Sequence, residues 1–414
     1  MARKETVAVI GAGAVGCAAA FQLARRGWHV RLIDPAPPGS RTTAASAAIL
    51  AVSHVTPLAM PGVPWRVPGM LASRTGPLSL RWRDLPGLAP WFARFAGAAK
   101  PRTAEASCTA LAALMADARP AWERLLERLD RPGDLVQRGW LTVGRTREPS
   151  PAAAAELDHK RAHGVTAADL DGAAVREACP AVDPAVAHGI DFPACAHLPA
   201  PEASVRAVAE AAGDAAGITA ARVHRIAADA TGVRLTTDAG EIAADRAVVA
   251  AGPWSAPLAS AVGARVPLAA ERGYWVTLPA PGVTLDRPLL DADNAITATP
   301  LADGVRLAGK AEFAALTAPP TPRHARAVTA AGTRLLPGLT TDGMRWGMGA
   351  RPSTPDSRPV IGTAPAGERV ILAFGHGHIG LTAAARTGEI VAALADGADP
   401  GLDLAPFAPD RFRA

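Results

Sequence analysis

The stretch Thr6-Val-Ala-Val-Ile-Gly-Ala-Gly-Ala-Val-Gly16 decides the fold. Residues 6–10 are a short, β-branched apolar run, and three glycines in GxGxxG spacing lead from it into a second apolar stretch. A further apolar run over residues 28–33 ends in Asp34. A strand, a glycine turn, a helix and a terminal acid in this order predict a parallel α/β unit that binds a dinucleotide.

Each residue type in this turn has a physical reason. Gly11 permits the tight turn, Gly13 lets a pyrophosphate approach the positive end of the helix, and Gly16 lets the helix lie close to the strand. Asp34 is placed to accept hydrogen bonds from a ribose. The expected cofactor-binding residues in this segment are Gly11, Gly13, Ala14, Val15, Gly16, Asp34 and Pro35.

Composition limits the possible classes of protein. A chain of 414 residues with 49% apolar and 20% charged residues is typical of a globular protein with about two domains. The net charge of +5 is spread without a basic stripe, which argues against nucleic-acid binding. The four cysteines form no CxxC pair, so we expect buried thiols and no metal site.

The start of the chain allows two interpretations. Arg3 and Lys4 before an apolar stretch resemble a secretory signal, but the glycines and the later Gln22, Arg25 and Arg26 fit one poorly. No other apolar stretch approaches the ~20 residues of a membrane span. We therefore expect a cytoplasmic protein, with any membrane association peripheral.

A second glycine turn lies near the other end of the chain. Residues 370–374 resemble a strand, Gly375-His-Gly-His-Ile-Gly380 a turn, and residues 381–394 a helix. Two such turns, far apart in sequence, indicate one large cofactor held at both ends, which favours FAD over NAD.

The remaining elements are expected from periodicity and turn signals. Residues 60–90 are rich in Pro, Gly and Trp and are expected to be irregular, with at most one helix or strand. Most tryptophans, together with Met344, Trp346 and Met348, are expected in the core. Helices are expected at residues 91–99, 104–129, 203–216 and 322–336, and strands at residues 141–143, 189–192, 219–227, 233–236, 247–251, 274–278, 295–299 and 305–309.

Four motifs together carry a resemblance to a known family. They are the N-terminal fingerprint, residues 245–255 (DRAVVAAGPWS), residues 349–362 (GARPSTPDSRPVIG) and residues 375–388. The chain resembles the FAD-dependent D-amino-acid oxidoreductases, which include D-amino-acid oxidase and glycine oxidase, and most of all the bacterial D-amino-acid and D-hydroxyproline dehydrogenases.

This resemblance implies an α/β fold with two domains. A discontinuous FAD-binding Rossmann domain of the glutathione-reductase type would comprise residues 1–60, 195–265 and 340–414. An α+β substrate-binding domain built on an antiparallel sheet would comprise residues 61–194 and 266–339.

The resemblance also assigns further cofactor contacts. Arg41, Thr42 and Thr43 lie where relatives bind the pyrophosphate, and Val223 lies where relatives hold the adenine. Residues 44–48 depart from the usual flavin-loop pattern, because Ala-Ala-Ser-Ala-Ala stands there. The last turn and its helix would stabilise negative charge on reduced flavin. The further residues expected at the cofactor are Ser46, Ala47, Ala48, Ile49, Ala251, Gly252, Trp254, Arg351, Gly375, His376, Gly377, His378, Ile379, Gly380, Leu381 and Thr382.

Five residues are candidates for the reaction itself. Arg351 is the first candidate for binding a substrate carboxylate through two parallel hydrogen bonds, and Arg272 is a weaker one. Tyr274 would bind the same carboxylate, or else fill the core as a strand tyrosine. His378 and His54 would shape the pocket or relay a proton, or else be structural. None of these residues is acidic, which slightly disfavours strongly cationic substrates.

The implied reaction is oxidation of a D-amino acid or a cyclic, D-proline-like amino acid to the imino acid, with hydride transfer from Cα to flavin N5. The electron acceptor is left open between a quinone, an electron-transfer protein and oxygen. The alternatives are an enzyme for another amine (glycine, sarcosine or an opine), a flavin subunit of a multi-subunit dehydrogenase, and a flavin-binding protein without enzymatic activity.

Overall fold

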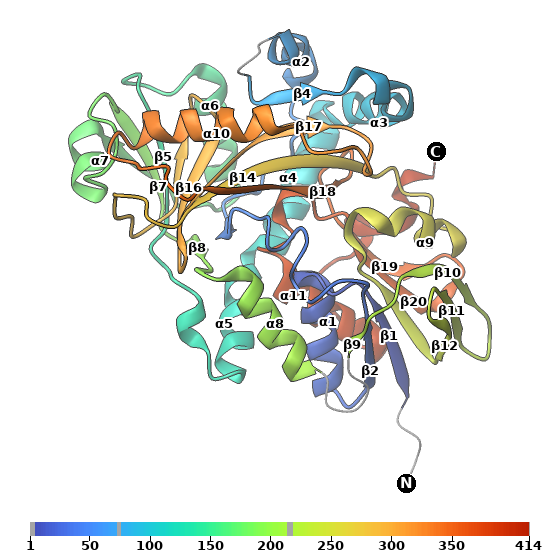
Figure 1. Cartoon of the computed structure of the whole chain (residues 1–414). Helices are drawn as coiled ribbons and strands as arrows, with labels where there is room; N and C mark the ends of the chain where they lie inside the picture. The colour runs from blue at the N-terminus through green and yellow to red at the C-terminus, as the bar shows by residue number, and fades with distance from the viewer. Residues whose placement is uncertain (1–4, 73–75, 213–217, 414) are drawn as a thin grey trace.

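The computed structural model describes residues 5–72, 76–212 and 218–413, so Arg3 and Lys4 of the possible signal lie outside the described residues. Two sheets organise this part of the chain, one in the lower half of Figure 1 and one in the upper half. The α/β class with a Rossmann-type sheet and a large, mostly antiparallel sheet is confirmed. No helix among the described residues is long and apolar enough to cross a bilayer.

The lower sheet contains the N-terminal fingerprint. Its strand order is β19-β20-β13-β1-β2-β9, with every neighbouring pair parallel except the antiparallel β19 and β20. The strands are β1 (Thr6–Ile10), β2 (His29–Ile33), β9 (Ile218–Thr219), β13 (Arg246–Val249), β19 (Val360–Ala364) and β20 (Gly367–Phe374). The first two match the predicted strands to within one residue.

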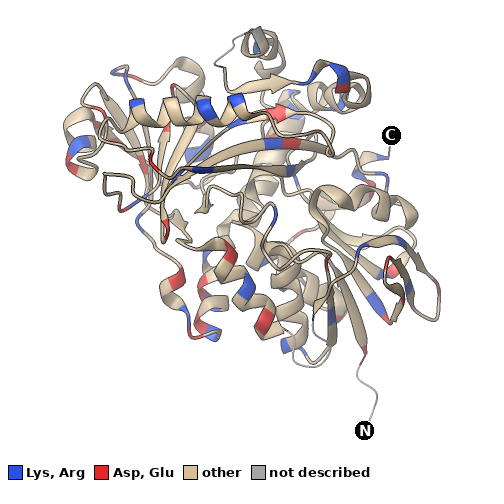
Figure 2. Ribbon diagram, viewed as in Figure 1, with Lys and Arg blue, Asp and Glu red and all other residues tan. Residues whose placement is uncertain are grey.

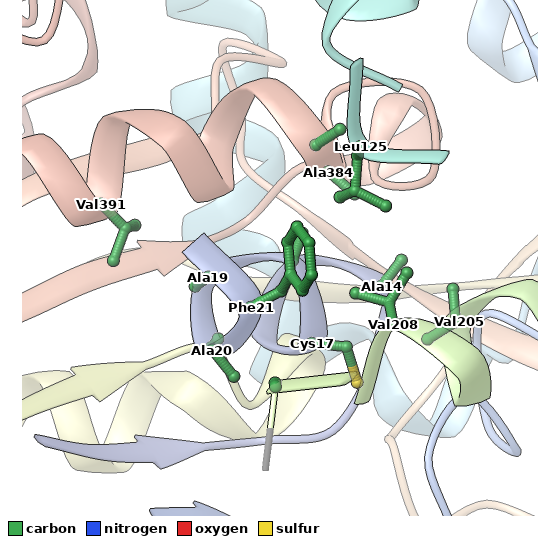
Figure 3. Close-up of a cluster of buried hydrophobic side chains, with 14 of the residues drawn as sticks. Ala14, Cys17, Ala19, Ala20, Phe21, Leu125, Val205, Val208, Ala384 and Val391 are labelled. Atoms are coloured by element: carbon green, nitrogen blue, oxygen red, sulfur yellow. The ribbon is translucent and has the colours of Figure 1, made fainter. Parts of the chain in front are cut away.

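Helix α1 (Ala14–Arg25) packs between this sheet and two other helices, α8 (Pro201–Ala212) and α11 (Ala384–Ala395). Figure 3 shows small side chains of α1 facing Val205 and Val208 of α8 and Ala384 and Val391 of α11. A Cβ on Gly388 of α11 would lie 2.6 Å from the carbonyl carbon of Ala18. The first and last long helices of the chain therefore touch almost backbone to backbone.

The upper sheet has the order β18-β14-β17-β16-β15-β5-β7-β6, with β4 beside β17. It is antiparallel except for the pairs β15–β5 and β17–β4. Its strands are β4 (Leu78–Leu80), β5 (Trp140–Gly144), β6 (Ala168–Asp171), β7 (His188–Phe192), β14 (Ala269–Leu278), β15 (Leu289–Asp291), β16 (Ile296–Leu301), β17 (Gly304–Phe313) and β18 (Arg345–Ser353). The predicted boundary at residue 340 assigns β18 to the cofactor domain, whereas β18 pairs with β14 here.

Helices and two small sheets complete the described structure. Helix α10 (Pro322–Leu335) runs across one face of the upper sheet, and α2 and α3 lie above its β4 edge (Figure 1). Lys and Arg are interspersed with Asp and Glu over both halves (Figure 2). The other elements are β3 (Ile49–Leu50), α2 (Val63–Ala72), α3 (Leu85–Ala98), α4 (Pro101–Ala116), α5 (Ala118–Arg128), α6 (Pro151–Ala162), α7 (Gly172–Ala178), β8 (Ala196–His197), β10 (Val223–Ala228), β11 (Val233–Thr237), β12 (Gly240–Ala244) and α9 (Ser255–Ala261).

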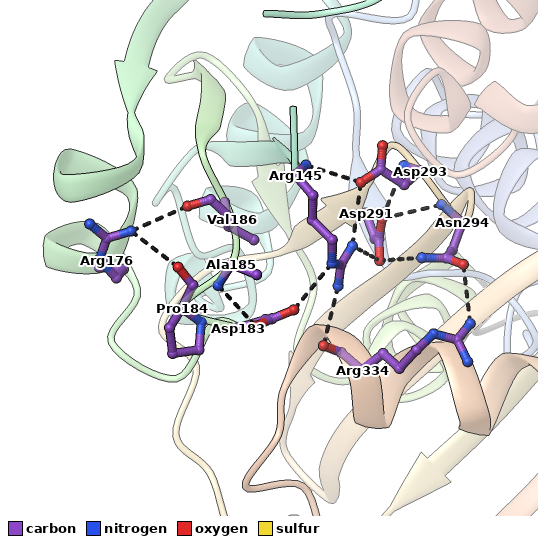
Figure 4. Close-up of polar contacts among 10 residues, drawn as sticks. All are labelled: Arg145, Arg176, Asp183, Pro184, Ala185, Val186, Asp291, Asp293, Asn294 and Arg334. Carbon is purple, nitrogen blue, oxygen red and sulfur yellow. Dashed lines mark hydrogen bonds and ion pairs between the residues drawn. The ribbon is translucent and has the colours of Figure 1, made fainter. Parts of the chain in front are cut away.

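A polar cluster connects β5, β15 and α10 in the upper half of the molecule (Figure 4). Arg145, just after β5, donates to Asp183 at 3.1 Å and to the buried Asp291 of β15 at 3.2 Å. Asn294 donates to Asp291 at 2.8 Å and accepts from Arg334 of α10 at 3.1 Å. The buried carboxylate is thereby paired, which removes most of the cost of burying it.

Several expected elements differ from those observed. Residues 60–90 contain α2, β4 and the start of α3, so the prediction of one element at most was wrong. Pro64 and Pro86 lie in the first turns of α2 and α3, where the amides need no intrahelical acceptor, whereas Pro68 and Pro90 lie inside these helices. The helix predicted over 104–129 is two helices, α4 and α5. The helix predicted over 203–216 is observed to Ala212, and its last residues lie outside the described ones.

The core expectation also failed at some positions. Trp65 is 88% exposed and Trp82 67% exposed, and Met344 and Trp346 are exposed as well. Trp91, Trp122 and Trp140 are buried, as are all four cysteines, which confirms those predictions. Trp65 lies on α2 and Trp82 just before α3, two elements at the outer edge of the upper half (Figure 1), whereas Trp346 lies on β18.

Candidate active site

One cavity of about 1160 Å³ is lined by residues from both sheets and both glycine turns. It is large enough for a dinucleotide and a small substrate together. All the predicted cofactor and reaction residues line it except Gly16, Thr382 and Arg272. The structure thus brings together residues that are more than 350 positions apart in sequence.

The first glycine turn is too tight for side chains. Gly11 has φ +108°, and a Cβ there would lie 2.4 Å from the carbonyl oxygen of Ala250 at the end of β13. A Cβ on Gly16 would lie 1.8 Å from the carbonyl oxygen of Gly11. Gly16 therefore acts by letting α1 touch the turn, which explains why it does not line the cavity. Asp34 accepts from the Ala12 amide at 2.9 Å and so also braces the turn.

The segment after Asp34 returns to the start of α1. The amide of Ala14 donates to Thr43 Oγ1 at 3.1 Å, and Thr42 Oγ1 donates to the carbonyl of Ala350 at 3.0 Å. The guanidinium of Arg41 lies over the Trp254 ring, 4.9 Å from its centroid. This places a fixed cation at the cavity near the positive end of α1, as an anionic pyrophosphate requires.

The unusual loop at residues 44–48 has a steric explanation. A Cβ on Gly349 of β18 would lie 2.6 Å from the Cβ of Ala45, so this approach leaves no space for a larger side chain. Arg306 of β17 donates to the carbonyls of Ala44 and Ser46 and stacks on Trp275, 4.7 Å from its centroid. The loop is therefore held by its backbone and needs small residues.

The second glycine turn differs from its prediction in one respect. Gly375 and Gly377 have positive φ, +79° and +50°, and residues 377–379 form a 3₁₀ turn. Helix α11 begins at Ala384 rather than at residue 381, and the cavity lining ends at Leu381. The turn itself, and not the first turn of α11, therefore faces the cavity. Thr382 accepts from the Ala51 amide at 3.1 Å outside the cavity lining.

His376 and His54 are both neutral at physiological pH. His376 Nε2 lies 3.0 Å from Thr387 Oγ1, and burial lowers the His376 pKa to about 3. His54 packs edge-on against Trp140, with 5.1 Å between ring centroids. Burial, together with Lys160, His378 and Arg351, lowers the His54 pKa to about 3. Both line the cavity, but neither is charged there.

The cavity wall at β14 and β18 contains an acid that is not among the five reaction candidates. Glu271 is 1% exposed and accepts from Arg351 Nη1 at 3.1 Å, from His378 Nε2 at 2.7 Å and from Ser353 Oγ at 2.9 Å. Burial alone would raise the pKa of Glu271, but His378, Arg351 and Ser353 outweigh it and lower the pKa to about 2. The five candidates are not acidic, but this ionised acid lies beside two of them.

Arg272 and Tyr274 place their polar groups elsewhere. The Tyr274 hydroxyl donates to Glu312 Oε2 at 2.7 Å and accepts from the Thr321 amide at 2.8 Å. Arg272 Nε lies 3.5 Å from Glu312 Oε2, and its guanidinium is fully buried. Because strand neighbours point to opposite faces, these two side chains face α10 while Glu271 and Gly273 face the cavity. Tyr274 lines the cavity, but its hydroxyl does not lie beside Arg351.

Other cavity residues were not among the predicted site residues. Lys310 of β17 has φ +59° at a bulge opposite Gly273, and its Nζ donates to the carbonyl of Gly76 at 2.5 Å. The ring centroids of Trp91 of α3 and Phe313 of β17 are 5.1 Å apart. These residues and part of α2 line the outer end of the cavity, and only the aromatic content of residues 91–95 signalled them in the sequence.

One group of potential metal ligands lies outside these motifs. Glu105 and Cys108 of α4 and His163, which ends α6, have ligand atoms within 4.8 Å of one another. Burial and the nearby Glu105 raise the Cys108 pKa to about 11, so the thiol is protonated. The expectation of no metal site rested on sequence spacing, which cannot show a group formed by two separate helices.

The chain is similar to proteins of known family. A family model described as FAD dependent oxidoreductase matches residues 6–394. The D-amino-acid oxidase of Bradyrhizobium diazoefficiens is 35% identical over 98% of both chains, and the D-amino acid dehydrogenase of Rhizorhabdus wittichii is 30% identical over 98% of this chain and 100% of its own.

Solved structures show the same fold. Glycine oxidase from Geobacillus kaustophilus superimposes with a TM-score of 0.75 at 23% identity over 99% of each chain. L-proline dehydrogenase from P. horikoshii superimposes with a TM-score of 0.72 at 20% identity, covering 100% of this chain and 99% of its own.

Proposed function

The chain belongs to the FAD-dependent oxidoreductase family, and on that premise we propose that it oxidises a D-amino acid, including cyclic D-proline-like ones, to the imino acid. The D configuration is supported by the names of the two relatives at 35% and 30% identity. The proposed chemistry is loss of a hydride from Cα to flavin N5.

The residues of the cavity fit FAD. The turn at Gly11 leaves no space for a side chain, the start of α1 and Arg41 offer positive charge, and the turn over residues 375–381 closes the other end. We propose that the predicted residues at these places hold the adenosine, the pyrophosphate and the ring. When bound, FAD supplies the acceptor for two electrons from the substrate.

The observation that carries the proposal is the position of Arg351. Its guanidinium lies on the cavity wall, 24% exposed, and a Cβ on Gly273 would be 2.4 Å from its Nη2. Glu271 holds Nη1, and that contact fixes the plane of the group. A planar guanidinium in a fixed orientation binds a carboxylate through two parallel hydrogen bonds and so orients Cα.

The cavity also indicates what kind of side chain the substrate carries. Trp91, Phe92 and Phe313 form an aromatic cluster on its outer wall, with centroid separations between 5.1 and 5.3 Å. We propose that this wall contacts the part of the substrate beyond Cα. Apolar or cyclic side chains fit such a surface better than strongly polar ones, because burying an unpaired polar group is costly.

The test is anaerobic reduction of the purified yellow protein. Addition of D-alanine, D-phenylalanine, D-proline or cis-4-hydroxy-D-proline is expected to bleach the flavin spectrum, whereas the L forms leave it unchanged. Bleaching by L forms alone, or by none of the panel, would overturn the proposal and direct the search to glycine, sarcosine or an opine. Repeating the reaction with oxygen, a quinone or a dye as acceptor then separates an oxidase from a dehydrogenase.

A further inference from the structure

Glu271 is the centre of a hydrogen-bonded cluster, of which the proposed function uses only the contact with Arg351. A single oxygen, Oε1, accepts both from Arg351 at 3.1 Å and from His378 at 2.7 Å, while Oε2 accepts from Ser353 at 2.9 Å. The four residues come from β14, β18 and the second glycine turn. Glu271 therefore links a candidate carboxylate ligand to a histidine on the same cavity.

The carboxylate determines which nitrogen of His378 carries the proton. Because its three donors keep Glu271 ionised, it can only accept hydrogen bonds. His378 Nε2, at 2.7 Å, must then be the protonated nitrogen. In the neutral ring the lone pair is consequently on Nδ1, and His378 is 31% exposed on the cavity.

Among the groups around His378, this histidine is the one that can accept a proton from a substrate. Glu271 of β14 bonds both His378 and Arg351 of β18 through the same oxygen. His54, which follows β3, interacts electrostatically with His378, Arg351 and Lys160 of α6. His54 is neutral because its pKa is lowered to about 3. Arg351 is a permanent cation whose charge Glu271 balances. A proton gained by His378 would therefore be stabilised by Glu271 at direct hydrogen-bond distance.

We propose that Glu271 is a positioning residue that makes His378 Nδ1 the acceptor of the substrate's ammonium proton. This inference rests on the proposed function. The N–H bond of the ammonium group breaks, its electron pair stays on the substrate nitrogen, and the proton bonds to Nδ1. The amine is then neutral, which loss of a hydride from Cα requires, and the imidazolium is paired with Glu271. His378 later releases the proton to water through the open cavity.

The same carboxylate serves the other end of the substrate. By holding Arg351 Nη1 it fixes the guanidinium plane against Gly273, where no side chain intervenes. Glu271 thus sets the carboxylate site and the amine site from a single rigid strand. Both ends of an α-amino acid are thereby positioned relative to Cα.

The test compares Glu271→Gln with a matched control, Glu312→Gln, which changes an equally buried glutamate facing α10 on the other side of the sheet. The rate of anaerobic flavin reduction is measured from pH 6 to pH 10. In Glu271→Gln we expect a fall of about 100-fold at neutral pH, within the range for loss of general base catalysis. The half-maximal rate should move at least one unit to higher pH, since deprotonation by solvent then replaces His378. Glu312→Gln should keep the wild-type profile.

A second variant and a second readout keep the proposal open to refutation. His378→Asn changes a partly exposed side chain and should give the same shift of the pH profile even where Glu271→Gln fails to fold. In protein labelled with ¹⁵N-histidine, the His378 signals should report Nε2–H in the wild type and a tautomer mixture in Glu271→Gln.

The outcomes distinguish the two proposals. A wild-type flavin reduced by an amino acid, with unshifted pH profiles in both variants, would overturn the inference alone, and so would a wild-type Nδ1–H tautomer. A rise in KM without a shift of the pH profile would mean that Glu271 positions Arg351 only, which would overturn its proposed role at His378. A wild-type flavin that no amino acid reduces would overturn the proposed function.

Discussion

The two faces of β14 carry two buried glutamate clusters with opposite relations to the cavity. Glu271 bonds Arg351, His378 and Ser353 on the cavity side. Glu312 of the neighbouring β17 accepts from Tyr274 and from Thr321 Oγ1 at 2.9 Å on the side of α10. Burial opposes ionisation of both carboxylates, but hydrogen bonds and nearby positive charge lower both pKa values to about 2.

The two clusters differ in whether the partners of the glutamate can still contact a ligand in the cavity. Arg351 and His378 are partly exposed to the cavity, whereas the partners of Glu312 are committed to one another and to α10. A strongly shifted pKa therefore does not by itself mark a catalytic group, because structural ion pairs shift pKa values equally well. Substitutions in each cluster can separate a reactive cluster from a structural one.

The largest effect is expected from Arg351→Ala. Its kcat/KM should fall by about 100-fold or more, mostly through KM, because removal of one partner of a buried charge pair costs roughly 2–5 kcal/mol. FAD should stay bound. Arg345→Ala, on the same strand but exposed and paired with Asp303, is the control and should change kcat/KM less than twofold. Wild-type kinetics in Arg351→Ala would remove Arg351 from the carboxylate role.

Glu312→Ala should damage stability and not chemistry. It leaves the buried guanidinium of Arg272 without its carboxylate, which should lower the free energy of unfolding by about 3 kcal/mol. Urea unfolding monitored by far-UV circular dichroism measures this loss. The rate of flavin reduction per folded molecule should be unchanged, and a large drop in that rate would contradict the division between the two faces.

The stability of the folded protein should depend on the ionisation of these two glutamates at low pH. A carboxyl whose pKa is lowered on folding stabilises the protein above its unfolded pKa, and this contribution is lost as pH falls through the folded value. For Glu271 and Glu312 the window runs from about 4.5 down to about 2. Stability should therefore decline over this range, and less steeply in Glu312→Gln. An equal slope in the variant would mean that Glu312 is not ionised in the folded protein.

Tyr274→Phe should give the smallest effect. The change removes the hydroxyl between Glu312 and the Thr321 amide and should cost about 1–2 kcal/mol of stability. Steady-state kinetics should show kcat/KM within a factor of two of wild type. A larger loss, concentrated in KM, would mean that the hydroxyl reaches the substrate carboxylate after all.

The half of the molecule built on the lower sheet could be predicted because its signals are local. The strand, the glycine turn and Asp34 lie within one segment, and steric limits at Gly11 and Gly16 leave little choice of residue. The second glycine turn was found in the same way. The start of α11 at Ala384 was not, because a 3₁₀ turn over residues 377–379 and further turn residues up to 383 precede the helix, which composition alone does not show.

The half built on the upper sheet could be predicted less completely because its contacts are long-range. Glu271 and His378 are in contact although they lie 107 positions apart in sequence. Glu271 faces the cavity because side chains alternate along β14, so that Glu271 and Gly273 share one face. The sequence could not show which of two adjacent residues, Glu271 or Arg272, faces the cavity. The helices within residues 60–90 were missed because their Pro and Gly content resembles that of a loop.

The close contact of α1 with α11 has a consequence for biosynthesis. In the lower sheet, β1 pairs with β13, and β13 pairs with β20. The sheet around the first strand is therefore complete only after residues near 370 have been synthesised. Gly388 then packs on Ala18. A ribosome that has made three quarters of the chain has therefore made only an incomplete nucleotide site. We therefore expect FAD to bind only after about the last forty residues have been made, and a truncation there to leave colourless protein even though its N-terminal fingerprint is intact.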